Sequence, residues 1–269
     1  MEIERYLEDP ANEEAKMDIV SPMALTASEV RFYQTEGYLC LPGFVRGEAV
    51  SRLRAEVLAV LAAHGFDEAR LGRAETTADK LHQCSQYLAG SALDRLINGE
   101  ETLALAGTLI GGRAIRYLPF TAVKTGGGGG TFHFHQDNNY TMHDPALGSI
   151  NIWVALVDMT PENGCLQIVP RSHKKGQWPS HASDDGDTHQ QIDVDPLACL
   201  PLRMRAGDAV AFTRWTVHGS GPNATGEPRV AYALQYHRED VCKVDKETGE
   251  RRLLTAFPQW ATPPVDKLG

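Results

Sequence analysis

The segment at residues 131–140, TFHFHQDNNY, carries the pattern on which the predicted fold and site depend. If this segment is an extended strand, side chains two positions apart point to the same side. His135 and Asp137 then converge on one point, while Gln136 faces away. One further histidine from a distant strand would complete a face of two histidines and one carboxylate, which suits non-haem Fe(II) and leaves positions for substrates and oxygen. The structural alternative is a strand histidine hydrogen-bonded to a nearby acid.

The composition is that of an ordinary globular protein, with 269 residues of which 42% are hydrophobic and 23% charged. We expect one domain over residues 1–269, because all-β sandwiches and barrels of this size are often single domains. The formal net charge of −9 disfavours nucleic acid and anionic membranes as partners, since both require a basic surface. No apolar run approaches the roughly 20 residues of a membrane span.

The N-terminus is acidic where a secretory signal would be basic and then apolar. The five cysteines are scattered, odd in number and without a Cys-x-x-Cys pair. This usage is typical of free thiols in a reducing compartment and not of a disulfide framework or a structural zinc site. The sequence therefore predicts a cytoplasmic protein.

The N-terminal third is predicted to be helical after a loosely held, polar arm at residues 1–24. Thr26 and Glu29 form a capping-box pattern that opens a helix to about Glu36, and a strand follows at 38–41. Residues 47–63 have apolar positions at helical spacing, which predicts an amphipathic helix. A less regular helical stretch covers about 80–111 and ends at Gly111-Gly112.

Beyond residue 112 the apolar pattern changes to period two. The predicted strands are 115–124, 131–136, 149–157, 165–169, 201–204, 208–213 and 229–237. Short strands punctuated by turns predict a mainly β fold, a double-stranded β-helix (a cupin-like jelly roll) with the N-terminal helices packed against one sheet. Residues 174–200 form a long polar insertion that we interpret as a lid, with a solvated surface loop as the alternative.

His218 is the best candidate for the third metal ligand, because it directly follows the apolar strand at 209–212. Gly219 and Gly221 beside it permit close approach of the backbone. The weaker competitors are His143, His173 and His237. His133 shares a side with His135 if the strand is regular, and we expect it in the wall of the pocket and not among the ligands.

Arg229 lies eleven residues after His218 and opens a strand in which it shares a face with two alanines. An arginine with space beside it can grip a carboxylate-bearing cosubstrate through two parallel hydrogen bonds. A surface arginine is the alternative, and the spacing from His218 favours the cosubstrate. In the strand 149–157, Asn151 and Trp153 share a face that would line a pocket, whereas the opposite, fully apolar face must pack on the second sheet or on the helices.

This ordered set of residues resembles the phytanoyl-CoA dioxygenase family of Fe(II)- and 2-oxoglutarate-dependent oxygenases. The resemblance runs from about residue 26 to 237 and rests on His135-x-Asp137, Trp153, the segment NGCLQIVPRSH at 163–173, Gly207-Asp208, His218-Gly219-Ser220 and Arg229. It implies iron ligands at His135, Asp137 and His218, with Arg229 at the distal carboxylate of 2-oxoglutarate. It also implies further 2-oxoglutarate contacts at Ser220, Trp153 and Thr121, and at Lys80 or Lys124. Arg171 is a departure, because the family usually has glycine there.

The implied cofactor is Fe(II), and the implied cosubstrates are 2-oxoglutarate and O2. The implied activity is oxidation, most simply hydroxylation, of an unactivated C–H of a small organic metabolite, with release of succinate and CO2. Halogenating relatives have a small residue in place of Asp137, so the carboxylate here favours hydroxylation or a related oxidation such as desaturation, cyclisation or epimerisation. The candidates for the substrate wall are His133, Asn138, Asn139, Tyr140, Gln177, Trp178 and Trp215.

Specialised metabolism is one setting in which members of this family act. An acidic chain without an evident basic patch makes a CoA thioester a less attractive substrate than a small polar molecule, because CoA phosphates require cations. Two alternatives to an oxygenase stay open: a jelly-roll binding protein without turnover, and an unrelated metal-dependent hydrolase or isomerase. Neither requires a carboxylate anchor at Arg229.

Overall fold

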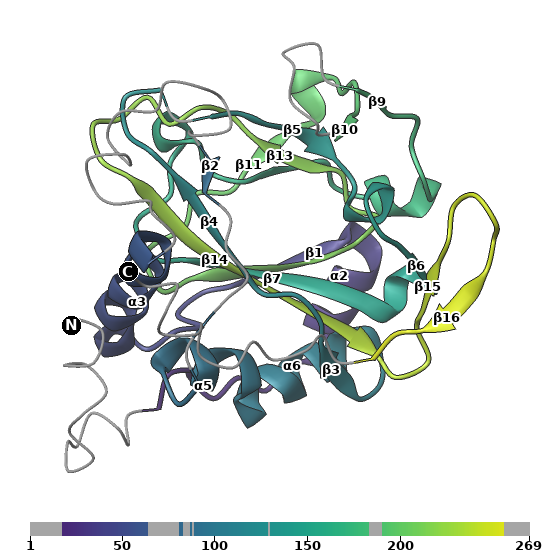
Figure 1. Ribbon diagram of the computed structural model, residues 1–269, viewed down its shortest axis with the longest axis horizontal. Coiled ribbons are helices and arrows are strands. Elements are labelled where there is room, and N and C mark those ends of the chain that lie inside the picture. The colour runs from purple at the N-terminus through teal and green to yellow at the C-terminus, as the bar shows by residue number, and fades with distance from the viewer. Residues whose placement is uncertain are drawn as a thin grey trace.

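Two antiparallel β-sheets form the central layers of the computed structural model (Figure 1). The structure describes residues 18–63, 87, 89–128, 130–182 and 190–255, together with the backbone of 81–82. The larger sheet has the strand order β1-β12-β7-β14-β4-β2, with β3 also paired to β14, and the smaller sheet has the order β11-β8-β13-β5. The predicted mainly β, jelly-roll fold class is confirmed.

The strands are short, as the turn-rich sequence predicts. Those of the larger sheet are β1 (Tyr38–Leu41), β2 (Leu81–His82), β3 (Ala114–Arg116), β4 (Phe120–Lys124), β7 (Ser149–Ala155), β12 (Ala209–Thr213) and β14 (Arg229–Arg238). Those of the smaller sheet are β5 (Phe132–His135), β8 (Gln167–Ile168), β11 (Leu200–Pro201) and β13 (His218–Ser220). Outside these two sheets lie β6 (Met142–Asp144), β15 (Cys242–Val244) and β16 (Arg251–Leu253), which pair together, and the pair β9 (His181–Ala182) and β10 (Gln190–Gln191).

Four α-helices lie within the described residues. They are α2 (Ala27–Glu36), α3 (Gly47–Ala63), α5 (Ala92–Asn98) and α6 (Glu100–Ile110). The capping box of Thr26 and Glu29 is present at α2, and α3 has the predicted bounds. The helical prediction for 80–111 is wrong in its first part, because residues 81–82 form a strand paired with β4. The described helices within this stretch, α5 and α6, begin after Ser91, the N-cap of α5.

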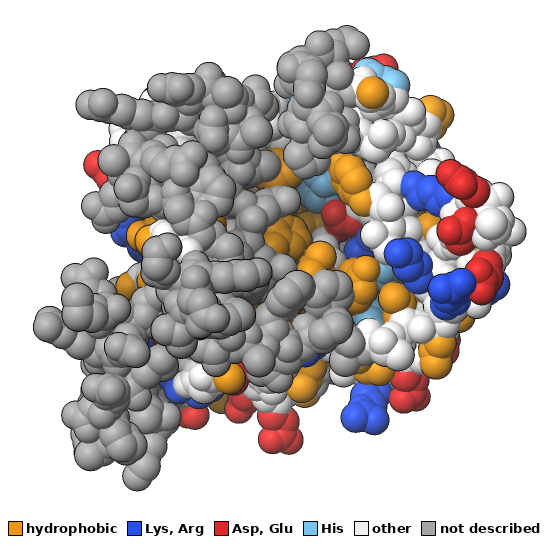
Figure 2. Space-filling view, in the orientation of Figure 1, with side chains coloured by type: hydrophobic (Ala, Val, Ile, Leu, Met, Phe, Trp, Pro, Cys, Tyr) orange, Lys and Arg blue, Asp and Glu red, His pale blue; other side chains and the backbone are white. Residues whose placement is uncertain are grey.

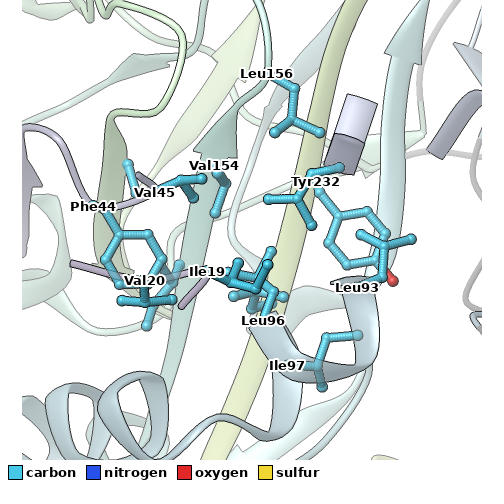
Figure 3. Close-up of a cluster of buried hydrophobic side chains, with 14 of the residues drawn as sticks. Ile19, Val20, Phe44, Val45, Leu93, Leu96, Ile97, Val154, Leu156 and Tyr232 are labelled. Carbon is cyan, nitrogen blue, oxygen red and sulfur yellow. The ribbon is translucent and has the colours of Figure 1, made fainter. Parts of the chain in front are cut away.

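The helices contribute to one buried cluster with one face of the larger sheet, and α5 and α6 lie below that sheet in Figure 1. The apolar face of β7 packs against them, because Val154 and Leu156 belong to one buried cluster with Leu93 and Leu96 of α5 (Figure 3). Of the two alternatives that the sequence left open for this apolar face, the second sheet and the helices, the helices are correct. The opposite face of β7 packs towards the smaller sheet in a second cluster that includes Trp153.

One sequence-based interpretation of an irregular segment needs correction, and the lid interpretation of residues 174–200 stays a prediction. Residues 18–24 are not part of a loose arm, since Ile19 and Val20 are buried and Val20 forms a bridge to Val45; residues 1–17 lie outside the described residues. The described parts of the 174–200 insertion are tied to the smaller sheet, because the buried Ile192 donates its N–H to the carbonyl of Phe134 at 2.7 Å. No helix among the described residues is long and apolar enough to cross a membrane.

The strand predicted at 131–136 ends before Asp137, so His135 and Asp137 do not lie on one regular strand. β5 ends at His135, and Asp137 begins a 3-10 helix over Asp137–Asn139. The predicted strand at 115–124 is likewise divided into β3 and β4 by three residues that include Pro119, which cannot donate a ladder hydrogen bond. Neither change alters the sheet to which these segments belong.

Candidate active site

Three side chains from two segments far apart in the sequence meet between the sheets. His135 ends β5 and lies opposite His218, which begins β13. Oδ1 of Asp137 is 3.8 Å from Nε2 of His135 and 3.9 Å from Nε2 of His218. The convergence predicted from alternation is present, although it arises because the chain turns after His135 and not because Asp137 continues the strand.

Both histidine rings are held in the tautomer that a metal ligand needs. Nδ1 of His135 donates to the carbonyl of His133 at 2.7 Å, and Nδ1 of His218 donates to the carbonyl of Thr216 at 3.0 Å. These bonds turn Nε2 of each ring towards the common point, where the neutral form offers a lone pair to a metal. Asn151 donates a hydrogen bond to Oδ2 of Asp137, which leaves Oδ1 available. The three donor atoms lie within 4.8 Å of one another and could hold a divalent metal ion such as Fe(II).

These side chains line a cavity of about 400 Å³ between the two sheets. On the face shown in Figure 2, a histidine and an acidic side chain are visible in a hollow among hydrophobic ones. The predicted site residues that line the cavity are His135, Asp137, Tyr140, Trp153, His218, Ser220 and Arg229. The metal triad and the predicted cosubstrate arginine therefore share one chamber.

Arg229 is 2% exposed and has no acidic side chain within ion-pair distance among the described residues. Its Nη1 donates to the carbonyl of Gly164 at 2.9 Å and its Nη2 to that of Ala122 at 3.1 Å, while Nε has no hydrogen bond within the described part of the chain. The guanidinium lies 5.2 Å from the ring of Trp153, and burial lowers its pKa to about 9, so it stays charged at neutral pH. A buried cation of this kind fits the carboxylate of 2-oxoglutarate.

Lys124 lies behind this end of the cavity. Its Nζ donates to the carbonyl of Ser220 at 3.1 Å and to that of Gly221. Burial, together with the nearby charge of Arg229, lowers the pKa of the amine to about 5. The lysine therefore supports the segment after His218 and is not among the cavity-lining residues.

Several predicted site residues lie away from the cavity. Thr121 pairs with Tyr232 of the helix-facing cluster and is not among the cavity-lining residues, so its expected contact with 2-oxoglutarate stays a prediction that this placement does not support. His133 is not among the cavity-lining residues: the register of β5 with β13 shifts, and Phe132 and His135 are the residues of β5 that line the cavity. The expected role of His133 in the substrate wall stays a prediction. Lys80 lies outside the described residues.

The other proposed wall residues have structural contacts. The side chain of Asn138 bonds to the backbone of His143, and Asn139 is buried outside the cavity. Gln177 is exposed. The side chain of Gln136 accepts a hydrogen bond from the backbone N–H of Trp178 and donates one to the backbone carbonyl of Trp215. Of that group, Tyr140 lines the cavity, and its hydroxyl accepts a hydrogen bond from the N–H of Gln190 in the 174–200 insertion.

The competing histidines serve the framework. His173 contacts the carbonyl of Gln34 at the end of α2, and His143 bonds to the hydroxyl of Ser149. Burial lowers the pKa of His143 to about 2, with help from the charge of Arg214, so its ring is neutral. Arg214 itself lines the cavity and was missed by sequence reasoning. The available signal was an arginine four residues before His218 in a stretch that carries no other charged side chain from 209 to 217.

The jelly roll, the histidine–aspartate–histidine triad and the buried arginine together define an Fe(II)- and 2-oxoglutarate-dependent oxygenase. Residues 33–231 match the phytanoyl-CoA dioxygenase (PhyH) family, and the chain belongs to this family. It is accordingly an iron- and 2-oxoglutarate-dependent dioxygenase.

Named relatives and solved structures agree with this assignment. A methylphosphonate hydroxylase from Gimesia maris is 30% identical over 216 residues, which cover 79% of this chain and 81% of that protein. An ectoine dioxygenase from Halomonas elongata is 25% identical and covers 85% of this chain and 74% of that protein. The carbocyclase SnoK from nogalamycin biosynthesis superposes with a TM-score of 0.69 at 22% identity, over 88% of this chain and 98% of that chain, and supports the fold.

Proposed function

We propose that this dioxygenase hydroxylates an aliphatic C–H of a small polar metabolite, with Fe(II) held by His135, Asp137 and His218. The observation that carries the proposal is the pairing, in one buried cavity, of this triad with Arg229. Neither a simple binding protein nor a metal-dependent hydrolase requires a buried, acid-free arginine beside three metal donors. In this assignment Arg229 receives the distal carboxylate of 2-oxoglutarate, and Ser220 and Trp153 lie beside it.

Bound Fe(II) and 2-oxoglutarate supply the activation of O2 for substrate oxidation, with release of succinate and CO2. The chain's own residues orient and protect these groups. Asn151 holds one oxygen of Asp137 so that the other faces the two histidines. Phe120, Phe132 and Phe212 line the same cavity and exclude water from the site where the C–H is oxidised. No general base is required.

Hydroxylation is the outcome that the named relatives favour. The Gimesia maris relative is named for hydroxylation of methylphosphonate and the Halomonas elongata relative for oxidation of ectoine, both of which are small polar molecules. The carboxylate of Asp137 occupies the position that is small in halogenating members of the family, which favours oxygen insertion. A cavity of about 400 Å³ that must also admit 2-oxoglutarate disfavours a bulky CoA thioester.

An anaerobic titration tests the cofactor assignment. Fe(II) and 2-oxoglutarate added to the wild-type protein should produce a visible metal-to-ligand charge-transfer band. The Arg229→Ala variant should bind 2-oxoglutarate at least ten-fold more weakly, because the charge-assisted hydrogen bonds are lost. A wild-type protein that gives no band would refute the proposal.

Product analysis tests the reaction outcome. Compound pools are screened for substrate-stimulated succinate release, and the product of an active compound is examined by mass spectrometry. Hydroxylation adds the mass of one oxygen atom, whereas desaturation or cyclisation removes two hydrogens. We expect Asp137→Gly to lose hydroxylation, and normal turnover by this variant would contradict the ligand assignment.

A further inference from the structure

Arg214 lies in the cavity wall, in the loop between β12 and β13, and is 4% exposed. Its Nη2 donates to the carbonyl of Asp137 at 3.0 Å and to that of Thr141 at 2.9 Å, and its Nε donates to the side chain of Asn138 at 3.3 Å. These bonds fix the plane of the guanidinium. The remaining nitrogen, Nη1, makes no hydrogen bond within the described part of the chain. It is not completely buried.

Arg214 and Arg229 lie towards different ends of the cavity. Arg229 and Gln235 share one face of β14, and six residues of extended chain separate their Cα atoms by about 20 Å. Gln235 pairs with Asn151, whose side chain bonds to Asp137. Because Arg214 bonds to the carbonyl of Asp137, it belongs to the Gln235 end of the cavity, away from the end that Arg229 occupies.

The charges on the cavity wall do not balance without a further anion. Among the described lining residues the formally charged ones are Asp137, Arg214 and Arg229. When the site is loaded, the charges of Fe(II) and 2-oxoglutarate cancel, and the carboxylate of Asp137 offsets one of the two guanidinium groups. One buried positive charge is left, and burying it without a partner is costly.

We propose that Arg214 binds an anionic group of the substrate, a carboxylate or a phosphonate, through Nη1. This inference rests on the proposed function and names its substrate class. Arg214 is bonded to the backbone of a metal-ligand residue, so the anionic group and the oxidised C–H lie only a few bonds apart in the substrate. Gln235 and Tyr117 line the same cavity and provide further polar contacts for a small molecule.

The test uses the charge-transfer band of the anaerobic wild-type protein with Fe(II) and saturating 2-oxoglutarate, so that Arg229 is occupied. Matched anionic and neutral compounds are titrated: propionate against propionamide, and methylphosphonate against its dimethyl ester. At least one anion should shift the band saturably, and its neutral partner should require at least a ten-fold higher concentration. The propionate and methylphosphonate arms distinguish a carboxylate from a phosphonate substrate.

Two variants separate recognition from a structural role. Arg214→Gln should keep the 2-oxoglutarate band but bind the active anion 10–100-fold more weakly, since a hydrogen bond to a charged group is worth about 1.5–3 kcal/mol. Arg214→Lys keeps the charge and should recover part of the affinity, which a purely structural role does not predict. Equal shifts by anions and neutral partners, no response to any anion, or wild-type anion affinity in Arg214→Gln would overturn the inference. Absence of the band in the wild type would instead refute the proposed function.

Discussion

At the scale of single residues, one atom of each triad side chain makes a hydrogen bond within the protein, and the other polar atom is left for the metal site. One nitrogen of each histidine ring is hydrogen-bonded to a carbonyl and the other is left for the metal site. The same division applies to the oxygens of Asp137, of which one is bonded to Asn151. Such bonds orient ligands before the metal arrives, so the geometry does not depend on the ion alone.

Lys124 predicts a specific dependence of stability on pH. Its folded pKa, about 5, lies far below the ordinary value of 10.5, so between these values the unfolded chain binds one more proton than the folded chain. Folding stability therefore rises with pH across this window. In Lys124→Met this contribution is absent, and the stability of the variant relative to wild type should fall as pH rises from 6 to 9, by at most about 1.4 kcal/mol per pH unit. Urea unfolding without 2-oxoglutarate measures this difference, and pH-independent differences would contradict it.

Arg171 explains the family's preference for glycine at this position. Its φ of 65° is in the left-handed region, which glycine adopts without strain. The side chain compensates in part through an exposed ion pair with Glu36. We expect Arg171→Gly to melt close to wild type and about 2–4 °C above Arg171→Ala, which keeps the strained backbone and loses the ion pair. Calorimetry of the three proteins provides the check, and an alanine variant as stable as the glycine variant would show that no strain is present.

At the scale of elements, the pairing of β5 with β13 brings two of the ligands together. The register shifts between His218 and Ser220, which re-aims the side chains that follow His218. Gly219 lies so close to β5 that an added Cβ would be 2.9 Å from the carbonyl oxygen of Phe132. The absence of a side chain at this position is therefore a condition of the ligand geometry.

Gly219→Ala should push β13 away from β5 and separate His218 from His135. We expect Fe(II) affinity, measured by the anaerobic band, to fall at least ten-fold, with a smaller loss of thermal stability. Gly221→Ala is the matched control, because an added Cβ there meets nothing within 4 Å and its φ is not in the left-handed region. Similar losses in both variants would mean that the close approach at Gly219 is not the cause.

At the scale of the whole molecule, the two faces of β7 have different roles: one packs against the helices and the other lines the cavity. Ile152 is buried among residues that pack against the helices, whereas the adjacent Trp153 lines the cavity beside Arg229. Ile152→Val should lower the free energy of unfolding by about 0.5–1.5 kcal/mol and leave 2-oxoglutarate affinity unchanged. Trp153→Phe should weaken 2-oxoglutarate binding, because the ring beside the guanidinium becomes smaller. Urea unfolding and the anaerobic titration measure the two quantities, and a change in affinity in Ile152→Val would contradict this separation.

Local patterns predicted many of the elements correctly. The capping box at Thr26, the helix at 47–63 and the strand at 229–237 depend on hydrogen bonds and periodicities that lie within a few residues of each other in the sequence. The errors fall where tertiary contacts override such patterns. Residues 81–82 pair with β4, and Asp137 leaves the strand that alternation predicts because the chain turns there into a 3-10 helix.

The sequence by itself predicted the jelly-roll class, and together with the family resemblance it predicted the triad His135, Asp137 and His218 and the arginine at 229, because these side chains stand in a specific order along the chain. Only the tertiary structure decided which neighbouring side chains reach the cavity. His133, Thr121 and Asn138 are near the site in sequence but are not among the cavity-lining residues, whereas Arg214 reaches the cavity from a loop without a motif. The physical reason is that a cavity wall is assembled from both sheets, and its composition depends on strand register, on turns and on long-range packing.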